Sequence, residues 1–251
     1  IMLTPPMAFA QTANWITADD STRNDRNVWI EFHKEFVLKK NIKKAEAKIA
    51  ADSKYWLWIN GEMVVFEGGL KRGPNRNDTY YDVVDLASYL KKGKNEIKVL
   101  LWHFGKSGFS HNSSGKSGMI IDAPAISLRT DKSWLSQRLD CYQMADKPRP
   151  NYRLSEANIR YDARLEGQER LKPPLEIGKW GDQPWGNLIL RPIPQWKDYG
   201  VKDAQWTTGK DDAGNVVLAA RLPYNMQMTP VIELTAAKEG TTVRMETDHI
   251  M

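Results

Sequence analysis

The chain has 251 residues, enough for one large β domain or two smaller ones, and its formal net charge is +5. Lys and Arg are spread along the chain in short clusters such as Lys39-Lys40 and Lys43-Lys44, so the gathered basic block of a nucleic-acid-binding protein is absent from the sequence. A single cysteine, Cys141, excludes an internal disulfide, and no apolar run approaches the roughly 20 residues that span a membrane.

The first residues of the chain are largely apolar and end in Ala8-Phe9-Ala10, the small-x-small pattern that signal peptidases cut. We interpret Ile1–Gln11 as the remnant of a secretory signal within a leader of residues 1–13, and we expect the mature protein to begin near Gln11. This interpretation predicts export, which in a bacterium means the periplasm or the extracellular space. The alternatives are a disordered apolar N-terminus or an arbitrary start of the chain.

Short β-strands are predicted along most of the remaining chain. Val28–Leu38 alternates apolar and polar residues with a period of two, which is typical of a half-buried strand, and a bulge is expected near Lys34. Strands are also expected at Ala45–Ala51, Tyr80–Leu86 and Lys94–Phe104, and Leu86 to Leu90 is expected to form a short helical turn.

Asn60-Gly61 predicts a tight β-hairpin, because a type I′ turn needs positive φ at both central residues. In the preceding strand, Lys54–Ile59, the side chains of residues 55, 57 and 59 are expected to face the core. Trp56 and Trp58 then share the opposite face. They can stack on a sugar ring or pack against a neighbouring domain, and we favour packing.

Two long irregular loops, Gly68–Asp78 and Gly105–Gly118, are rich in Gly, Asn and Ser, and loops of this length are often functional. Strands are expected to resume at Met119–Ile121 and Ala125–Leu128. Seven prolines make Pro148–Pro194 loop-rich.

Three further strands are predicted near the end of the chain, at Val216–Ala220, Val231–Leu234 and Thr241–Glu246. They are too few to close a second sandwich. We therefore predict an all-β chain, with a jelly-roll-like antiparallel β-sandwich over residues 14–198. The beginning of a second β-sandwich follows over residues 199–251, cut inside that domain.

Several elements of this scaffold resemble the N-terminal β-sandwich of bacterial α-L-rhamnosidases, which are glycoside hydrolases. In chain order they are Phe32–Phe36, Ala50–Tyr55, Leu57–Gly61, Tyr81–Leu86, Lys92–Asn95 and Val99–Leu101. Tyr161–Arg164 is the more specific match, since it resembles the Tyr-Asp-Ala-Arg element that follows this sandwich in the family. Gly214–Val217 and Gly240–Arg244 resemble the opening of the family's next β domain, whereas Gly105–Pro150 matches poorly.

The resemblance implies that the parent protein hydrolyses terminal L-rhamnose with inversion, using two carboxyl groups on an (α/α) barrel further along the same chain. Nothing in this sequence matches that barrel, so no catalytic residue is carried over. We predict the non-catalytic ancillary portion of a secreted enzyme, with a rhamnose-containing oligo- or polysaccharide and the barrel domain as partners. The alternatives are a stand-alone carbohydrate-binding module and a purely structural domain.

Five residues around the second long loop are candidates for sugar contact: Trp102, His103, Phe109, His111 and Asn112. They place aromatic rings beside hydrogen-bonding side chains, as sugar recognition requires. The alternative is that the loop histidines are simply solvated. Metal ligation by these histidines is not expected, because no cysteine or carboxylate cluster accompanies them.

Asn75, Asn77 and Asp78 can supply oxygen ligands to calcium at alternate positions, but the same residue types are common in turns. Calcium at this loop is thus the one cofactor considered, and no other is expected. Asp162 and Arg164 are expected to form a structural ion pair.

Overall fold

The computed structural model describes residues 13–69, 72–109, 111–145, 154–168, 170–197, 199–222, 231–233, 235 and 242–243. The chain separates into two compact units between Trp196 and Lys197, and each is described by itself. The predicted signal remnant lies outside the described residues. Of the strand predicted at Val231–Leu234, residues 231–233 have no regular secondary structure, and most of Thr241–Glu246 is not described.

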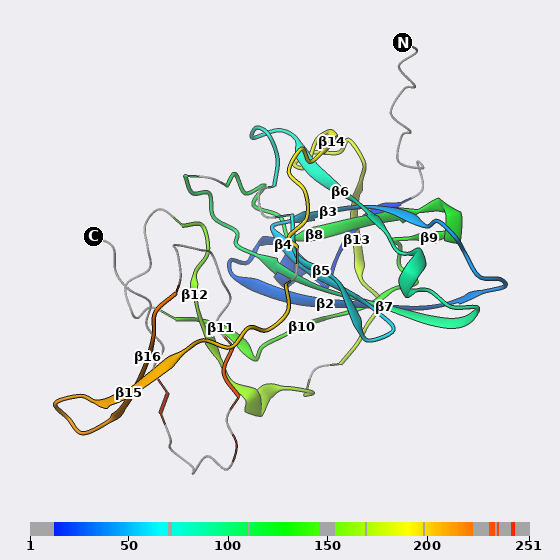
Figure 1. Cartoon of the computed structure of the whole chain (residues 1–251). Helices are drawn as coiled ribbons and strands as arrows, with labels where there is room; N and C mark the ends of the chain where they lie inside the picture. The colour runs from blue at the N-terminus through cyan, green and yellow to red at the C-terminus, as the bar shows by residue number, and fades with distance from the viewer. Residues whose placement is uncertain are drawn as a thin grey trace. The chain divides into compact units, whose positions relative to one another are not determined.

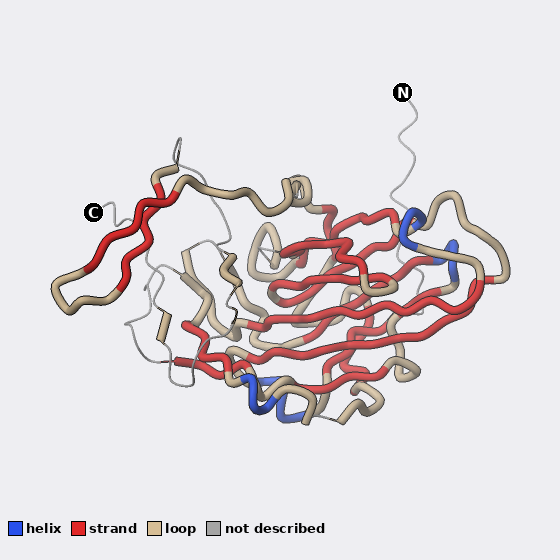
Figure 2. The backbone as a smooth tube through the Cα atoms, turned by 60° about the horizontal axis from the view of Figure 1, so that its bottom comes forward, coloured by secondary structure: helices blue, strands red, loops and turns tan. Residues whose placement is uncertain are grey.

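The first unit is a sandwich of two largely antiparallel sheets, with one parallel strand pair at the edge of the larger sheet, which confirms the all-β prediction (Figures 1 and 2). The larger sheet has the order β13-β1-β8-β3-β6-β14, with β9 beside β8. Its strands are β1 (Asn14–Thr17), β3 (Glu46–Asp52), β6 (Thr79–Asp85), β8 (Gly118–Ala123), β9 (Leu128–Arg129), β13 (Leu175–Lys179) and β14 (Leu188–Leu190).

The second sheet has the order β10-β2-β7-β4-β5. Its strands are β2 (Val28–Leu38), β4 (Lys54–Ile59), β5 (Glu62–Gly68), β7 (Gly93–His103) and β10 (Leu135–Arg138). A hairpin of β11 (Tyr142–Ala145) and β12 (Asn158–Tyr161) stands apart from both sheets. The helical elements are short: α1 (Asp20–Asn24), η1 (Ala87–Tyr89), η2 (Pro124–Ile126) and η3 (Ala163–Leu165).

The core lies between the inner faces of the two sheets. Tyr55, Leu57 and Ile59 are fully buried there, as the alternation predicts. β2 pairs with β7 without interruption from Val28 to Leu38, so the bulge expected near Lys34 is wrong. Apolar and polar side chains alternate between the two faces of these long strands. This alternation fixes their register, because a slip by one residue would turn all the apolar side chains of a strand toward solvent.

The hairpin between β4 and β5 is confirmed. Asn60 has a φ of 52° and Gly61 a φ of 84°, the positive values that a type I′ turn requires. The Asn60 side-chain amide also donates to the carbonyl of Tyr89 at 2.9 Å and to Oδ1 of Asn95 at 3.0 Å. The turn is thus tied to η1 and to the start of β7 at this end of the sandwich.

Two segments differ from the sequence prediction. Of the strand predicted at Ala125–Leu128, only Leu128 belongs to a strand, because Pro124 opens η2 and Ser127 closes it in the left-handed conformation. The proline-rich segment, predicted as loop, contributes β13 and β14 to the larger sheet. In the same segment, Trp185 stacks on Trp15 with ring centroids 4.6 Å apart, which buries the outer face of that sheet.

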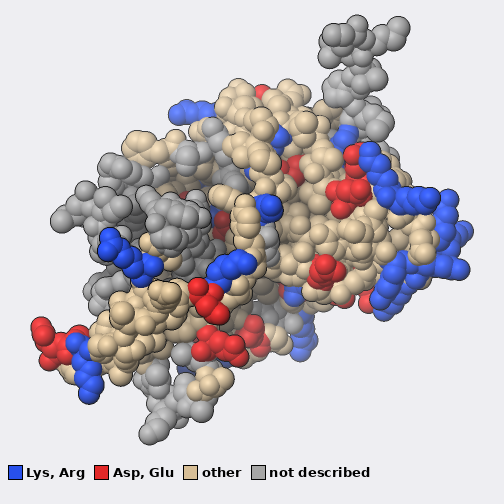
Figure 3. Space-filling model, in the orientation of Figure 1, with Lys and Arg blue, Asp and Glu red and all other residues tan. Residues whose placement is uncertain are grey.

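Lysines that are separated in the sequence gather at one end of the first unit (Figure 3). The turn after β2 carries Lys39-Lys40, and the turn before β7 carries Lys91-Lys92. These turns are adjacent because Leu38, at the end of β2, pairs with Gly93, at the start of β7. The fold therefore assembles a basic surface that no single stretch of sequence displays.

The described part of the second unit is a hairpin of β15 (Trp206–Lys210) and β16 (Val216–Ala220), and the latter was predicted as a strand. The Asp211 carboxylate shapes its turn by accepting from the backbone N–H groups of Ala213 and Asn215 at 3.0 and 2.8 Å. No helix in the described ranges has the length and apolar character to span a bilayer.

Candidate functional site

The two loops singled out in the sequence pack against each other at one end of the sandwich. We name them the β5–β6 loop (residues 69–78) and the β7–β8 loop (residues 104–117). The backbone N–H of Arg72 donates to Nδ1 of His111 at 3.4 Å, and Arg72 Nε donates to the carbonyl of Asn112 at 2.6 Å. These hydrogen bonds tie the two loops together.

Arg72 anchors the β5–β6 loop from inside. Its side chain is fully buried, and burial lowers the pKa of its guanidinium. The guanidinium donates to the carbonyls of Asp78 (3.1 Å) and Arg76 and to Oγ1 of Thr79 (3.1 Å). A planar group with five donors can hold several carbonyls at once, so Arg72 fixes the backbone path of both loops.

Asp52 anchors the β7–β8 loop. Its carboxylate is fully buried at the end of β3 and accepts from the Ser53 hydroxyl and the Ser114 backbone N–H, each at 2.8 Å. Burial alone raises the pKa of this carboxyl, but the imidazoles of His103 and His111 more than offset it and hold that pKa well below its ordinary value. A buried carboxylate with these donors keeps its charge and holds the loop in place.

Each imidazole is held by its neighbours in the site. His103 Nδ1 lies 2.9 Å from the carbonyl oxygen of Asp52, which can only accept, so Nδ1 donates. Nδ1 of His111 lies 3.4 Å from the backbone nitrogen of Arg72, and its Nε2 lies 3.8 Å from Oδ1 of Asp52. Both rings are buried, so the alternative that these histidines are merely solvated is wrong.

The structure divides the five predicted sugar-contact residues into two groups. Trp102, His103 and His111 are enclosed, with 7%, 0% and 3% of their surface exposed. Asn112 is half-buried and contributes its carbonyl to Arg72. Phe109, in contrast, is 79% exposed on the β7–β8 loop. Sugar contact by these five residues stays a prediction. Among them, Phe109 has the aromatic ring that is accessible to a sugar.

The tryptophans of the second sheet form a stacked cluster on its outer face. Trp29 stacks on Trp102 at 4.6 Å, on Trp56 at 5.6 Å and on Tyr142 at 4.2 Å between ring centroids. Trp102 Nε1 donates to Oδ1 of Asn27 at 2.8 Å. Within the described residues, Trp56 therefore packs on Trp29 of its own sheet, which agrees with a packing role for this face, and packing against a neighbouring domain stays a prediction.

The oxygens proposed for calcium already have hydrogen-bonding partners. Asn75 Oδ1 accepts from the backbone N–H groups of Asn77 (2.8 Å) and Asp78 (3.0 Å). The Asp78 carboxylate accepts from the Asn75 amide (2.9 Å) and the Asn187 backbone (3.1 Å). Among the described residues, no group of three or more His, Cys, Asp or Glu is arranged to hold a metal. That the chain holds no cofactor stays a prediction, with calcium at this turn as the alternative.

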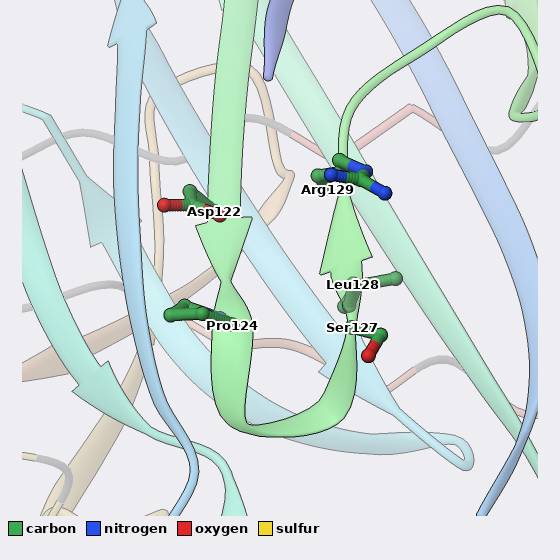
Figure 4. Close-up of a pocket in the computed structure, with 5 residues that line it drawn as sticks. All are labelled: Asp122, Pro124, Ser127, Leu128 and Arg129. Atoms are coloured by element: carbon green, nitrogen blue, oxygen red, sulfur yellow. The ribbon is translucent and has the colours of Figure 1, made fainter. Parts of the chain in front are cut away.

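Two shallow hollows in the first unit lie away from these loops. One, of about 130 Å³, sits at the turn between β8 and β9, and Asp122 is the one carboxylate among its lining residues (Figure 4). The other, of about 170 Å³, contains Asp19 and Asp140. Asp19 caps α1 with a lowered pKa, and Asp140 pairs with Arg138 at 3.0 Å. The first hollow has a single carboxyl group, and both carboxylates of the second already cap a helix or pair with an arginine, so neither hollow shows the facing carboxyl pair of a glycosidase.

The predicted ion pair between Asp162 and Arg164 is present. The guanidinium donates twice to the carboxylate, at 2.8 and 2.7 Å, and the Arg164 backbone N–H donates once more at 3.1 Å. The Arg164 hydrogen bond lowers the pKa of Asp162 to about 2. Asp162 thereby caps η3 and closes the corner after β12, as a structural pair does.

Sequence reasoning missed the buried charges of the site. Asp82 accepts from the Tyr55 hydroxyl at 2.7 Å and from Arg191 Nε, which brings the proline-rich segment onto β6. No local pattern marks Arg72 or Arg191. Asp52 does carry a signal, because it directly follows the apolar run Ile49–Ala51 at the end of β3, and a carboxylate that is buried there must find hydrogen-bond donors.

Three solved structures of α-L-rhamnosidases resemble this chain. The GH78 family rhamnosidase of Bacillus sp. GL1 aligns over 73% of this chain with 29% identity and a TM-score of 0.58. The enzymes of Aspergillus terreus and Dictyoglumus thermophilum align over 82% and 83% with 19% and 20% identity and TM-scores of 0.58 and 0.54. This chain spans 20–25% of the length of these three proteins. No protein-family model and no curated protein sequence matches it.

The comparison supports a rhamnosidase-related β domain. The Aspergillus and Dictyoglumus proteins share less than 25% identity with this chain, so they bear on its fold alone. The Bacillus protein shares both the fold and 29% of the aligned sequence. The resemblance drawn from the sequence and the structural likeness therefore point to the same group of proteins.

Proposed function

We propose that this chain is the non-catalytic ancillary β-sandwich portion of an α-L-rhamnosidase-like glycoside hydrolase that acts on rhamnose-containing glycans. The observation that carries the proposal is the shared fold, at 29% identity, with a GH78 rhamnosidase of which this chain spans 20%. The remaining length of such a protein leaves room for a catalytic (α/α) barrel, which is the proposed partner domain in the same protein.

The carboxylates of the described residues support a non-catalytic role. Asp52 and Asp82 are buried in hydrogen-bonded networks, and Asp162 is paired with Arg164. Glycosidic hydrolysis needs two carboxyl groups facing one bond, one of them with a raised pKa. The resolved carboxyl pKa shifts described above are all downward, which suits structural acceptors and not a proton donor.

We propose that the β5–β6 and β7–β8 loops supply the sugar-facing surface of the domain. Buried Arg72 and Asp52 hold the loop backbones, while Phe109 exposes its ring to solvent. Aromatic rings on a rigid frame stack on sugar rings at a low entropic cost. This arrangement favours weak contact with a glycan over a closed binding pocket.

We also propose that the protein is exported from a bacterial cell. The support is Ala8-Phe9-Ala10, which has the small-x-small pattern of a signal peptidase site. N-terminal sequencing of the secreted protein tests this proposal: a start near Gln11 is expected, and a retained Met2 contradicts it.

Isothermal titration calorimetry of the 251-residue chain with a rhamnose-containing oligosaccharide tests sugar binding. We expect weak binding to the unaltered chain and roughly tenfold weaker binding, about 1.4 kcal/mol, after Phe109→Ala. The matched control is Tyr199→Ala, which removes another ring with 69% exposure from the other unit. Equal affinity of the Phe109→Ala variant and the unaltered chain would exclude these loops as the sugar-facing surface.

A further inference from the structure

Seven lysines occupy one end of the first unit, and we name this surface the lysine end. Its members lie in the turn after β2, before β3, and around the start of β7: Lys39, Lys40, Lys43, Lys44, Lys91, Lys92 and Lys94. The pairing of Val37 with Lys94 and of Leu38 with Gly93 places the two turns side by side. Figure 3 shows blue atoms gathered at the right edge of the molecule.

The lysine end carries more positive charge than its carboxylates neutralise. Lys94 pairs with Glu35 at 2.8 Å and Lys44 with Glu46 at 3.0 Å. Asp85, also at this end, accepts from the backbone N–H groups of Ala45 and Ala87. The other five lysines are exposed and form no ion pair within the described residues. Their ammonium groups are therefore available to an anionic partner.

We propose that the lysine end binds an acidic polysaccharide, whose uronic-acid carboxylates the exposed ammonium groups neutralise. This inference rests on the proposed function, because a glycan-degrading protein meets its substrate as a polymer. Each exposed ammonium–carboxylate contact is weak on its own. Once one carboxylate of a polymer is bound, its neighbours are held close to the remaining ammonium groups at a high effective concentration. A polymer of uronic acids therefore binds far more tightly than a single sugar acid.

The composition of the lysine end favours carboxylates over nucleic acid. All seven basic residues are lysines, which present a single point charge, whereas phosphate and base recognition draws heavily on the planar fork of arginine. Single-stranded nucleic acid also requires exposed stacking rings, and the aromatic residue in this region, Tyr89, is half-buried against the core.

A membrane surface is also disfavoured. Proteins that bind anionic bilayers through lysines commonly add an apolar anchor of several large side chains. Val37 is the exposed apolar side chain adjacent to Lys94, and a single valine contributes little insertion energy. An acidic polysaccharide needs no such anchor, so it remains the partner that the surface fits best.

Affinity electrophoresis of the 251-residue chain through gels that contain polygalacturonate tests the proposal, with dextran as the neutral polymer. The variant Lys39→Ala/Lys40→Ala/Lys91→Ala/Lys92→Ala removes four exposed charges without introducing new ones. The matched control, Lys132→Ala/Lys179→Ala/Lys202→Ala/Lys210→Ala, removes four exposed lysines elsewhere. Circular dichroism checks that both variants remain folded.

We expect polygalacturonate to retard the unaltered chain and the control, and the lysine-end variant to bind at least about tenfold more weakly. Raising the salt concentration from about 50 to 300 mM should weaken binding strongly, because exposed charges are screened. Three results would overturn the proposal. The control variant could lose as much polygalacturonate binding as the lysine-end variant, or the lysine-end variant could bind as tightly as the unaltered chain. The unaltered chain could also bind duplex DNA or anionic vesicles more tightly than polygalacturonate.

The oligosaccharide titration separates this inference from the proposed function. If the unaltered chain binds the rhamnose-containing oligosaccharide but does not bind polygalacturonate, the lysine end is not an acidic-glycan site and the proposed function stands. If polygalacturonate binds at the lysine end and the oligosaccharide does not bind at all, the sugar-facing role of the loops fails instead.

Discussion

Asp52 offers the sharpest test of how the loop surface is built. Replacing it by alanine leaves the Ser114 N–H and the Ser53 hydroxyl without their acceptor inside a closed site, beside two buried imidazoles. Removing one member of a buried charged network costs about 3–5 kcal/mol. We therefore expect Asp52→Ala to lower the free energy of unfolding by that amount, a large fraction of the total stability of a domain.

Urea denaturation followed by tryptophan fluorescence measures this effect. The control is Glu62→Ala, which removes an exposed carboxylate from β5 and should change stability by less than about 0.5 kcal/mol. If Asp52→Ala unfolds the chain outright, Asp52→Asn keeps the shape and one acceptor and gives a measurable value. A loss for Asp52→Ala no larger than for Glu62→Ala would refute the anchoring role of Asp52.

The pH dependence gives a second, independent check. The folded-state pKa of Asp52 is depressed, so its contribution to stability is fully present above the unfolded-state pKa of about 3.9 and is lost as the pH falls through the folded-state value. The stability difference between the unaltered chain and Asp52→Asn should therefore be constant near pH 7 and shrink below about pH 4. A difference that grows on acidification would contradict the assigned direction of the pKa shift.

Three further outcomes are expected. In urea denaturation, Gly186→Ala should destabilise the chain by more than Gly115→Ala. Both glycines have positive φ, which costs alanine about 1–3 kcal/mol at either position. An added Cβ at Gly186 would also meet a carbonyl oxygen at 1.8 Å, whereas at Gly115 it would meet no atom within 4 Å. Trp56→Ala should cost about 0.5–1.5 kcal/mol more than Trp58→Ala in the same assay, because the Trp56 ring stacks on another indole. Excess EDTA should leave the melting temperature unchanged, since the oxygens of Asn75–Asp78 are hydrogen-bonded; a clear drop would show a bound calcium.

The elements with a strict period were predictable from the sequence. β2, β4 and β7 alternate apolar and polar residues, and Asn60-Gly61 has a single favourable conformation, so local preferences and tertiary structure agree. β13 and β14 were missed because they are short, lie in a proline-rich segment, and pair with β1 and β6 far away in the sequence. Such strands form where an existing sheet edge offers partners, which no local pattern records.

The candidate site was predictable only in outline. Loop length and composition identified the two loops. The residue types alone did not show which side chains are buried and hold the loops in place and which are exposed to a ligand. His103 and His111 looked like surface residues, and the structure buries them because a distant strand places Asp52 between them. The lysine end was missed for a similar reason: its residues belong to two turns that only strand pairing brings together.

The most direct test of the central claim is the release of nitrophenol from p-nitrophenyl α-L-rhamnoside by the purified 251-residue chain. We predict no release above the enzyme-free blank, because the catalytic pair is proposed to lie on another domain and Asp52, Asp82 and Asp162 are engaged in hydrogen bonds or ion pairs. Turnover by this chain that disappears on replacing one of its own carboxylates, for example in Asp140→Asn, would contradict the account.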